Sequence, residues 1–314
     1  MLSMASQREQ YLRKQQMTLA KLMFVAGALL LIGSGYFWLE KVHGNSNNVF
    51  WGMVDNNLKN FGQTQKSAQQ DPQRNLSQEQ SVQLQLGSQA VAAGETKILQ
   101  NANTPEQVNV DTQTIGTPST NYVRYTNLVI SQPLPDGKKP DFSNLENVWA
   151  QEPNTDGSKS ALIQAMFGSL GRMPVGYLQQ SQRQELVSTM QDNSVYKINP
   201  KTVKKEYRGI RPVYTYDIDV NVQQYVFMLK KFDSMSGLNQ ITAVDPTQFP
   251  ADEKVRLQVV VDIISRNLLS VTYMANKQTE NFSGFGAYAP IKLPAQAVSV
   301  EELERQLQAT LLGQ

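Results

Sequence analysis

The chain has 314 residues, a formal net charge of +2, no cysteine and one histidine, His43. This length is sufficient for one or two domains with hydrophobic cores, and the small net charge gives no support for nucleic acid as a partner. The lack of cysteine in the sequence excludes disulfides, thiolate nucleophiles and cysteine-based metal sites. A Ser-His-Asp triad would have to use His43, so we predict a protein without enzymatic activity, metal or cofactor.

The first 39 residues have the pattern of a membrane anchor. Residues 1–21 are polar and basic, and the next 18 residues, Leu22–Leu39, contain no charged side chain. As a helix this stretch would be about 27 Å long, close to the thickness of the hydrocarbon core. Tyr36 and Trp38 stand at its end, where aromatic side chains favour the interface. Because the positive charges precede the span, we predict a cytoplasmic N-terminus and an extracytoplasmic domain over residues 40–314 of a single-pass cell-membrane protein.

A cleaved signal peptide and a buried globular helix are the alternatives to an anchor. A signal peptide has the same order of charges, but its apolar core is usually shorter and ends at small residues. Here the apolar stretch ends in Y-F-W-L-E-K, which lacks such a cleavage site. We therefore favour an uncleaved transmembrane helix.

A helix followed by a meander is predicted next. Asn48–Phe61 has apolar residues near helical spacing, and it is either the first packed helix of the domain or a helix lying on the membrane. Gln63–Gln80 is rich in glutamine and is predicted to be either a linker or an exposed edge strand. Between Ser81 and Ile130, short alternating stretches indicate a β-meander whose outer face consists mostly of Gln, Asn, Ser and Thr.

Prolines and glycines then predict a surface loop over residues 131–158, pinned by Trp149. Regular elements are expected from there to the end of the chain. The predicted helices are Ala161–Leu170, Gln182–Gln191, Gln223–Phe232 and one that opens at the capping box of Ser299 and Glu302. The predicted strands are Val195–Ile198, Val203–Tyr207, Val213–Val222 and Asn276–Tyr288, together with the two strands of the hairpin Val255–Tyr273.

The hairpin Val255–Tyr273 carries the clearest alternation in the chain. A strand with one buried and one wet face alternates apolar and polar residues. The apolar face is predicted to carry Val255, Leu257, Val259, Val261 and Ile263. The opposite, mostly wet face is predicted to carry Arg256, Gln258 and Asp262, with Val260 and Ile264 as exceptions. The polar residues Ser265, Arg266 and Asn267 suit the turn between the strands.

The order of motifs over Val195–Pro294 resembles the lipoprotein-carrier (LolA/LolB-like) superfamily. The residues that carry the resemblance are R-G-I-R-P-V-Y-T-Y, the helix Q-Q-Y-V-F-M-L-K-K-F, the strands V-R-L-Q-V-V-V-D and L-L-S-V-T-Y, and the ending F-S-G-F-G-A-Y-A-P-I-K-L-P. The resemblance implies an α+β fold in which a curved antiparallel sheet forms an incomplete barrel and helices plug its open face. It also implies a space for acyl chains between sheet and helices. Carrier proteins diffuse freely or are anchored through a cysteine, whereas this chain has no cysteine.

Apolar and aromatic residues of this region either line a hydrophobic cavity or form an ordinary core. The cavity hypothesis names Tyr214, Tyr216, Tyr225, Leu229, Phe232, Leu257, Val259, Val261 and Tyr273. A second candidate is the pair Asp217 and Asp219, which share one face of a strand. Two such carboxylates suit a hard cation or acid/base work, but a solvated outer face opposite Tyr214 and Tyr216 explains them more simply.

Two hypotheses of function follow. The first is a membrane-anchored extracytoplasmic domain that binds a lipid or another hydrophobic ligand. The second is a cell-surface structural or protein-interaction module without a ligand cavity, with an envelope protein as its partner. In both, Leu22–Leu39 makes the contact with the membrane.

Overall fold

The computed structural model describes residues 44–87, 89–134, 137–154, 160–241, 243–287 and 289–312. The chain divides into two compact units, Met1–Val49 and Phe50–Gln314, and the description below concerns the second. The predicted basic tail over residues 1–21 and the predicted span Leu22–Leu39 lie outside the described residues. Among the helices that the structure describes, none combines the length and apolar character needed to cross a membrane.

The second unit is an α+β structure with a large antiparallel sheet. The helices are α2 (Ser46–Leu58, which belongs to this unit from Phe50), α3 (Ala161–Phe167), α4 (Gln180–Asp192), α5 (Val222–Met235) and α6 (Val300–Leu312), with a short 3-10 helix η2 (Pro246–Gln248). The strands of the first half are β1 (Gly62–Asp71), β2 (Leu76–Gln85), β3 (Val91–Gln100), β4 (Val108–Gly116), β5 (Thr120–Ile130) and β6 (Ala150–Pro153). Those of the second half are β7 (Tyr196–Ile198), β8 (Lys204–Arg208), β9 (Arg211–Asn221), β10 (Lys254–Asp262), β11 (Leu268–Tyr273), β12 (Thr279–Ser283) and β13 (Val298–Ser299).

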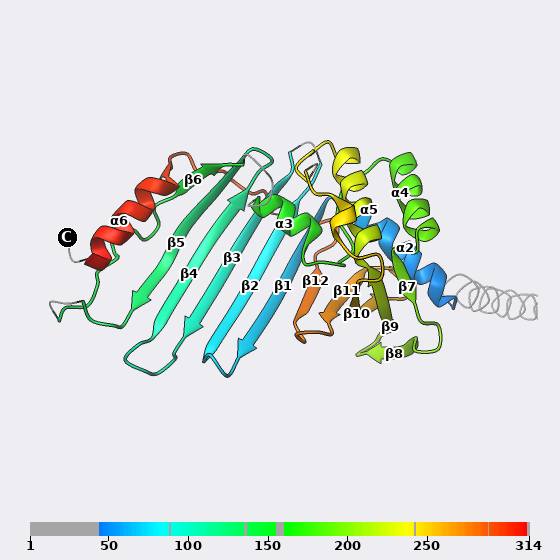
Figure 1. Ribbon diagram of the computed structural model, residues 1–314, viewed down its shortest axis with the longest axis horizontal. Coiled ribbons are helices and arrows are strands. Elements are labelled where there is room, and N and C mark those ends of the chain that lie inside the picture. Colours follow the sequence, from blue (N-terminus) through cyan, green and yellow to red (C-terminus); the bar gives the residue numbers. More distant parts are fainter. Residues whose placement is uncertain are drawn as a thin grey trace, which may run out of the picture. The chain divides into compact units, whose positions relative to one another are not determined.

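Two meanders make up this 13-stranded sheet. Its order is β13-β6-β5-β4-β3-β2-β1-β12-β11-β10-β9-β7, and β8 also pairs with β9 (Figure 1). Strands β1 to β5 follow one another as antiparallel neighbours, as do β9 to β12. The pairing of β1 with β12 joins the two meanders, and β13 beside β6 is a parallel pair. The sheet is therefore open, with β13 and β7 as its terminal strands.

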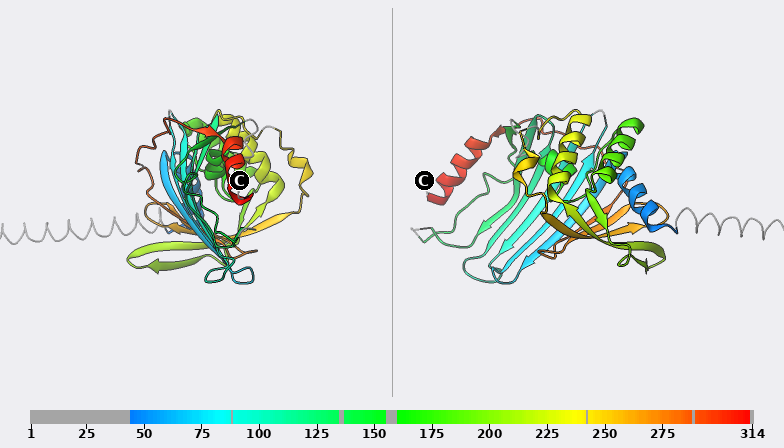
Figure 2. Two further views of the ribbon diagram at one scale, coloured as in Figure 1. Left: turned by 90° about the vertical axis from the view of Figure 1, so that its left-hand side faces the viewer. Right: turned by 45° about the vertical axis from the view of Figure 1, so that its right-hand side comes forward.

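Helices cover much of the second meander, and we call β9, β10 and β11 with helices α2, α4 and α5 the packed end. The three helices lie on one face of these strands (Figures 1 and 2). The ring of Phe50 on α2 lies 5.5 Å from that of Tyr216 on β9, measured between centroids. Helix α5 begins at the cap of Asn221, whose side chain accepts a hydrogen bond from the Gln224 N–H at 2.9 Å. We call the face covered by these helices the inner face.

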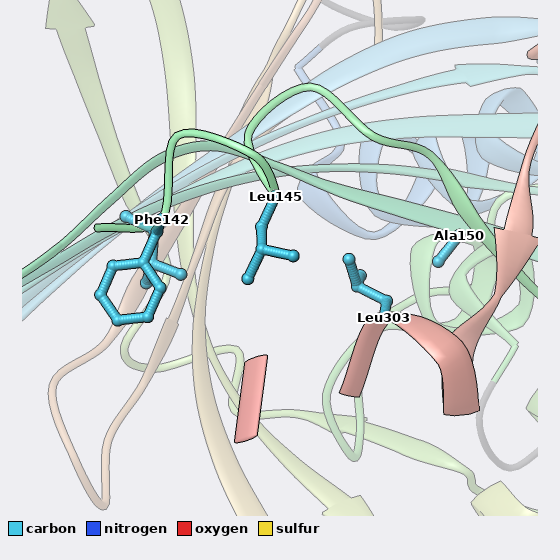
Figure 3. Close-up of a cluster of buried hydrophobic side chains, with 5 residues drawn as sticks. Phe142, Leu145, Ala150 and Leu303 are labelled. Carbon is cyan, nitrogen blue, oxygen red and sulfur yellow. The ribbon is translucent and has the colours of Figure 1, made fainter. Parts of the chain in front are cut away.

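A second, smaller core lies at the other end of the sheet. It joins α6 to β5 and to the loop before β6, as Figure 3 shows, through Leu128, Phe142, Leu145, Ala150 and Leu303. The capping box predicted at the start of α6 is confirmed in part, since the Glu302 N–H donates to Ser299 Oγ at 3.2 Å. Trp149 in the same loop lies under Arg124, 4.6 Å from the guanidinium carbon to the ring centroid.

Strands β1 to β4 form a third region, which we call the polar span. Most of its side chains are half-buried or exposed, and Gln, Thr, Ser and Asn make up 18 of its 39 residues. Of the two alternatives for Gln63–Gln80, the linker was wrong, because these residues form most of β1 and the first half of β2. The strand alternative is confirmed in part, since β1 is a strand but not an edge strand: β2 and β12 pair with its two sides.

Four further boundaries and orientations differ from the prediction. Helix α3 ends at Phe167 rather than Leu170, because Gly168 takes a φ of 65° that a right-handed helix does not allow. The strand predicted over Asn276–Tyr288 is confined to Thr279–Ser283. The predicted loop also contains β6. Asp262 was expected on a wet face but is buried, and its Oδ1 accepts the N–H groups of Ile264 and Ser265 in the hairpin turn.

Candidate functional site

A groove of about 530 Å³ lies between helix α3 and the inner face of the polar span, and we call it the α3 groove. Strands β1 to β4 provide its floor, and α3 with the two residues after it provides one wall. Its polar lining consists of Gln65, Gln80, Thr96, Thr114, Gln164, Ser169, Gln278 and Glu280. Its small or apolar lining consists of Val82, Ala92, Gly94, Ala161, Ala165 and Gly168.

Local sequence holds α3 against the sheet at this place. Ser160 caps the helix, with its Oγ accepting the Ile163 N–H at 3.3 Å. The Ala161 N–H donates to Asn121 Oδ1 on β5 at 3.0 Å, which fixes the start of the helix on the sheet. At Gly116 on β4, an added Cβ would come within 2.5 Å of the Leu162 nitrogen. Only glycine therefore permits this close approach of helix and strand.

Beneath one end of the groove lies a buried ion pair. The side chain of Arg172 is fully buried, and its Nη1 lies 3.1 Å from Glu280 Oε2. Gln65 Oε1 accepts a hydrogen bond from the same Nη1, and the Ala165 carbonyl accepts one from Nη2 at 2.6 Å. Ser169 Oγ donates to the second carboxylate oxygen of Glu280 at 3.2 Å. Each charge thus has an opposite charge and further hydrogen bonds as partners, which offsets the cost of burying it.

The backbone of Arg172 is held as firmly as its side chain. Its carbonyl accepts hydrogen bonds from the hydroxyls of Tyr225 at 2.8 Å and Tyr196 at 3.3 Å. At Gly168, an added Cβ would meet the guanidinium carbon of Arg172 at 2.0 Å. A side chain at position 168 would therefore displace the arginine from the pair.

The tyrosines around this pair stay protonated over the physiological range. Burial raises the pKa of Tyr225 well above 10, although the charge of Arg172 acts in the opposite direction. Burial also raises the pKa of Tyr273, and the carboxylate of Glu280 raises it further. Burial raises the pKa of Tyr196 in the same way. These phenols therefore stay neutral near neutral pH, and those of Tyr225 and Tyr196 act as hydrogen-bond donors to the Arg172 carbonyl.

The arrangement suits binding more than chemistry. The groove offers carboxamides and hydroxyls, each of which can both donate and accept hydrogen bonds, and its one carboxylate is already neutralised by Arg172. Within the part of the chain that the structure describes, no group of three His, Asp or Glu side chains is placed to hold a metal ion. A polar ligand without net charge matches this lining.

The nine residues predicted to line a hydrophobic cavity gather at the packed end. Eight of them are buried and Leu229 is half-buried. Several are in direct contact with helices or with one another, such as Tyr214 and Tyr216, whose ring centroids are 5.9 Å apart. Leu257 also lines a second groove of about 650 Å³ beside β7, β9 and β10, with Ile198, Pro200 and Met274.

Asp217 and Asp219 lie on the face of β9 opposite Tyr216, with Asp217 exposed and Asp219 half-buried. Asp219 Oδ1 is 3.3 Å from Arg256 Nε, and Asp217 accepts a hydrogen bond from Gln258 at 3.3 Å. The two carboxylates thus have ordinary partners on the neighbouring strand, which agrees with a solvated outer face.

Reasoning from sequence missed the Arg172–Glu280 pair. One signal was present, because Glu280 and Phe282 share a face of a strand whose alternation places apolar residues inside. An acid in such a position needs a buried cation. The partner, 108 positions away, could not be identified by spacing.

A scan against protein-family models, a search of curated proteins and a search of solved structures find no match to this chain.

Proposed function

We propose that this chain is a non-enzymatic binding module on the outer side of a cell membrane, and that it binds a neutral oligosaccharide in the α3 groove. Leu22–Leu39 serves as the single transmembrane anchor in this proposal, with the N-terminus in the cytoplasm. The protein then acts as a cell-surface interaction module, not as a carrier that ferries cargo between membranes.

The polar lining of the α3 groove is the observation that carries the proposal. The hydroxyls of a sugar ring both donate and accept hydrogen bonds. Carboxamide and hydroxyl side chains such as Gln80, Gln164 and Thr96 can accept from and donate to such hydroxyls. Small residues at Ala92, Gly94 and Ala161 leave room for a ring against the strands. Because Arg172 neutralises Glu280, a neutral ligand meets no unpaired buried charge.

The test is an array of neutral oligosaccharides probed with the full chain in lipid nanodiscs, followed by calorimetric titration of the best binders. Gln164 is exposed on α3, so Gln164→Trp fills the groove without disturbing the core. We expect this variant to weaken binding by about tenfold or more, equivalent to about 1.4 kcal/mol. Gln184→Trp, at an exposed position of α4 outside the groove, is the matched control. The proposal fails if no oligosaccharide binds, or if both variants bind as the unmodified chain does.

A lipid or other hydrophobic ligand is the second candidate, as the resemblance to the lipoprotein-carrier superfamily implies. This chain shares with that superfamily an antiparallel sheet with helices on one face. That the sheet also forms an incomplete barrel is part of the proposal. The observation that favours this candidate is the groove of about 650 Å³, where Ile198, Pro200, Leu257 and Met274 supply apolar surface. Lys197 supplies a positive charge for a headgroup, whereas Arg256 in the same groove is paired with Asp219.

Native mass spectrometry of the full chain, released from detergent, tests the second candidate. A bound lipid should add a discrete mass that organic extraction removes. Met274→Trp, which narrows the groove from its partly exposed rim, should reduce the occupied fraction. A spectrum of the bare chain under conditions that preserve other lipid complexes would count against a lipid ligand.

A further inference from the structure

A basic hairpin projects from the packed end. Strand β8 pairs with the first residues of β9, from Lys204 opposite Thr215 to Arg208 opposite Arg211, and every residue of β8 is exposed. The turn passes through Gly209, whose φ of 63° suits glycine. With the last two residues of β7 and the loop that follows them, the segment spans residues 197–211, and we call it the basic hairpin (Figure 1).

Its composition differs sharply from the rest of the domain. The basic hairpin has one acid, Glu206, and six cations: Lys197, Lys201, Lys204, Lys205, Arg208 and Arg211. Outside it, residues 44–314 contain 18 Lys and Arg against 24 Asp and Glu. Among the described residues, none of the ion pairs found involves a cation of the basic hairpin. The hairpin is thus a concentrated positive charge on an acidic domain.

Two large apolar side chains stand among these charges. Ile210, at the turn, is 95% exposed, and Tyr207 on β8 is 71% exposed. Tyr207 shares a face of the hairpin with Lys205, since the two lie two positions apart on one strand. Because Ile210 is almost fully exposed at the hairpin tip, it does not pack against the domain and its side chain is available to a partner.

We propose that the basic hairpin docks on the surface of an anionic phospholipid bilayer, with Ile210 and Tyr207 entering the interface and the Lys and Arg side chains meeting the headgroups. Each cation near an anionic surface adds attraction, and tyrosine favours the level of the headgroups. The same surface repels the acidic remainder of the domain. The domain is therefore oriented with the basic hairpin toward the bilayer. The inference shares only a membrane location with the proposed function and is independent of the α3 groove.

The lack of cysteine in the sequence permits a direct test in the full chain. Ile210→Cys gives one labelling site at the tip for an environment-sensitive fluorophore. The labelled chain is reconstituted into vesicles of phosphatidylcholine, with or without phosphatidylglycerol, that contain a lipid-borne quencher. We expect quenching at position 210 in the anionic vesicles and little in the neutral ones. Gln73→Cys, exposed in the β1–β2 turn, is the matched site and should be quenched in neither.

Charge variants in the Ile210→Cys chain separate electrostatic docking from simple proximity. Neutralising Lys204 and Lys205 to glutamine should lower the ratio of inserted to free label about 25-fold, at about fivefold per cation. Neutralising Lys254 and Lys292, which are exposed elsewhere, removes the same charge and should change the ratio little. Because β8 is fully exposed, these changes leave the packed core intact, which circular dichroism checks.

Three outcomes would overturn the inference. The first is equal quenching at position 210 in neutral and anionic vesicles. The second is equal loss with both pairs of lysine variants. The third is binding of the hairpin to nucleic acid or to an acidic protein with no response to anionic lipid. Flotation of the full chain with neutral vesicles tests the predicted anchor separately, so failure of the anchor and failure of the hairpin give different results.

Discussion

The packed end and the polar span belong to one hydrogen-bonded ladder, yet they bury different kinds of side chain. One register row crosses both on the inner face. It runs through Tyr216, Val259, Val271, Glu280, Ser67, Gln80, Thr96 and Thr112. The first three are fully buried under helices, whereas the last four are half-buried or exposed. The row changes from apolar to polar at Glu280.

This difference shows that two kinds of interaction stabilise the sheet, one at the packed end and one in the polar span. At the packed end, helices and aromatic rings remove apolar surface from water, which is the main favourable term in folding. In the polar span, long antiparallel strands satisfy their backbone groups through neighbours on both sides, and cross-strand pairs supply the remainder. The Arg172–Glu280 pair lies at the boundary between the packed end and the polar span. Disrupting this pair is therefore the most informative test of how the two regions differ.

Arg172→Met should have the largest effect. It leaves the Glu280 carboxylate buried without a cation, and breaking a buried pair in this way costs about 3–5 kcal/mol of the free energy of unfolding. Denaturant unfolding of the full chain in detergent measures it. Adding Glu280→Leu should recover much of the loss, because the unpaired charge is then removed. Arg183→Met, which breaks a more exposed pair with Asp55, should cost clearly less. Equal losses for both single variants would show that the junction has no special role.

How far the sequence predicts this molecule depends on which region is considered. Alternation identified the apolar face of Leu257, Val259 and Val261, because one-sided burial in the first part of β10 leaves a period of two in the chain. The prediction was wrong for the opposite face at the end of the strand, where Val260 and Asp262 are also buried. The same reasoning found α5, since Tyr225, Met228 and Phe232 repeat at helical spacing.

The meander predicted between Ser81 and Ile130 covers β3, β4 and half of β2, so only the first part of the polar span escaped this reasoning. A strand such as β1, with sequence G-Q-T-Q-K-S-A-Q-Q-D, carries no apolar period, because neither of its faces is fully covered. Its pairing with β12 joins residues more than 200 positions apart, which local pattern cannot specify. The α3 groove depends on that pairing, and so it was missed together with Glu280. The hydrophobic-cavity hypothesis instead named residues that gather at the packed end.

Leu303→Ala tests whether the small core under α6 unfolds independently of the packed end. Leu303 is buried against Leu145 and Leu128, and deleting its side chain should cost about 3 kcal/mol locally. Hydrogen exchange should show loss of protection in α6 and the end of β5, with β9–β11 unchanged. Leu307→Ala, at a partly buried position of the same helix, should have a smaller effect. Loss of protection throughout the sheet would mean that the two cores unfold as one unit.

The next expected effect is a dependence on alkaline pH, to which the buried tyrosines of the packed end contribute together with Tyr125 on β5, whose pKa burial also raises. Burial raises the pKa of Tyr216, Tyr225 and Tyr273 in the folded protein, whereas in the unfolded chain tyrosine titrates near pH 10. Below that pH both states hold the proton, so stability does not change through these groups. Above it only the unfolded state releases protons, and each tyrosine lowers the free energy of unfolding by about 1.4 kcal/mol per pH unit until its folded pKa is reached.

Tyr273→Phe should therefore raise the pH midpoint of alkaline unfolding. At neutral pH its effect should be small, since the Tyr273 hydroxyl has no well-formed hydrogen bond within the described part of the chain. Circular dichroism during base titration measures both quantities. An unchanged alkaline slope in this variant would show that the ring becomes solvated before the protein unfolds.

The smallest effects come from a pair of threonines that sit in the two regions. Thr215 on β9 is buried, and its hydroxyl has no hydrogen-bond partner among the described residues. Thr215→Val removes an unsatisfied polar group at nearly constant volume and should stabilise the protein by about 1 kcal/mol. Thr96→Val, on the half-buried floor of the α3 groove, should change stability by less than about 0.5 kcal/mol. If Thr96→Val stabilised the protein as much as Thr215→Val, the polar span would behave as a hydrophobic core. That result would contradict the proposal that its threonines serve to bind a ligand.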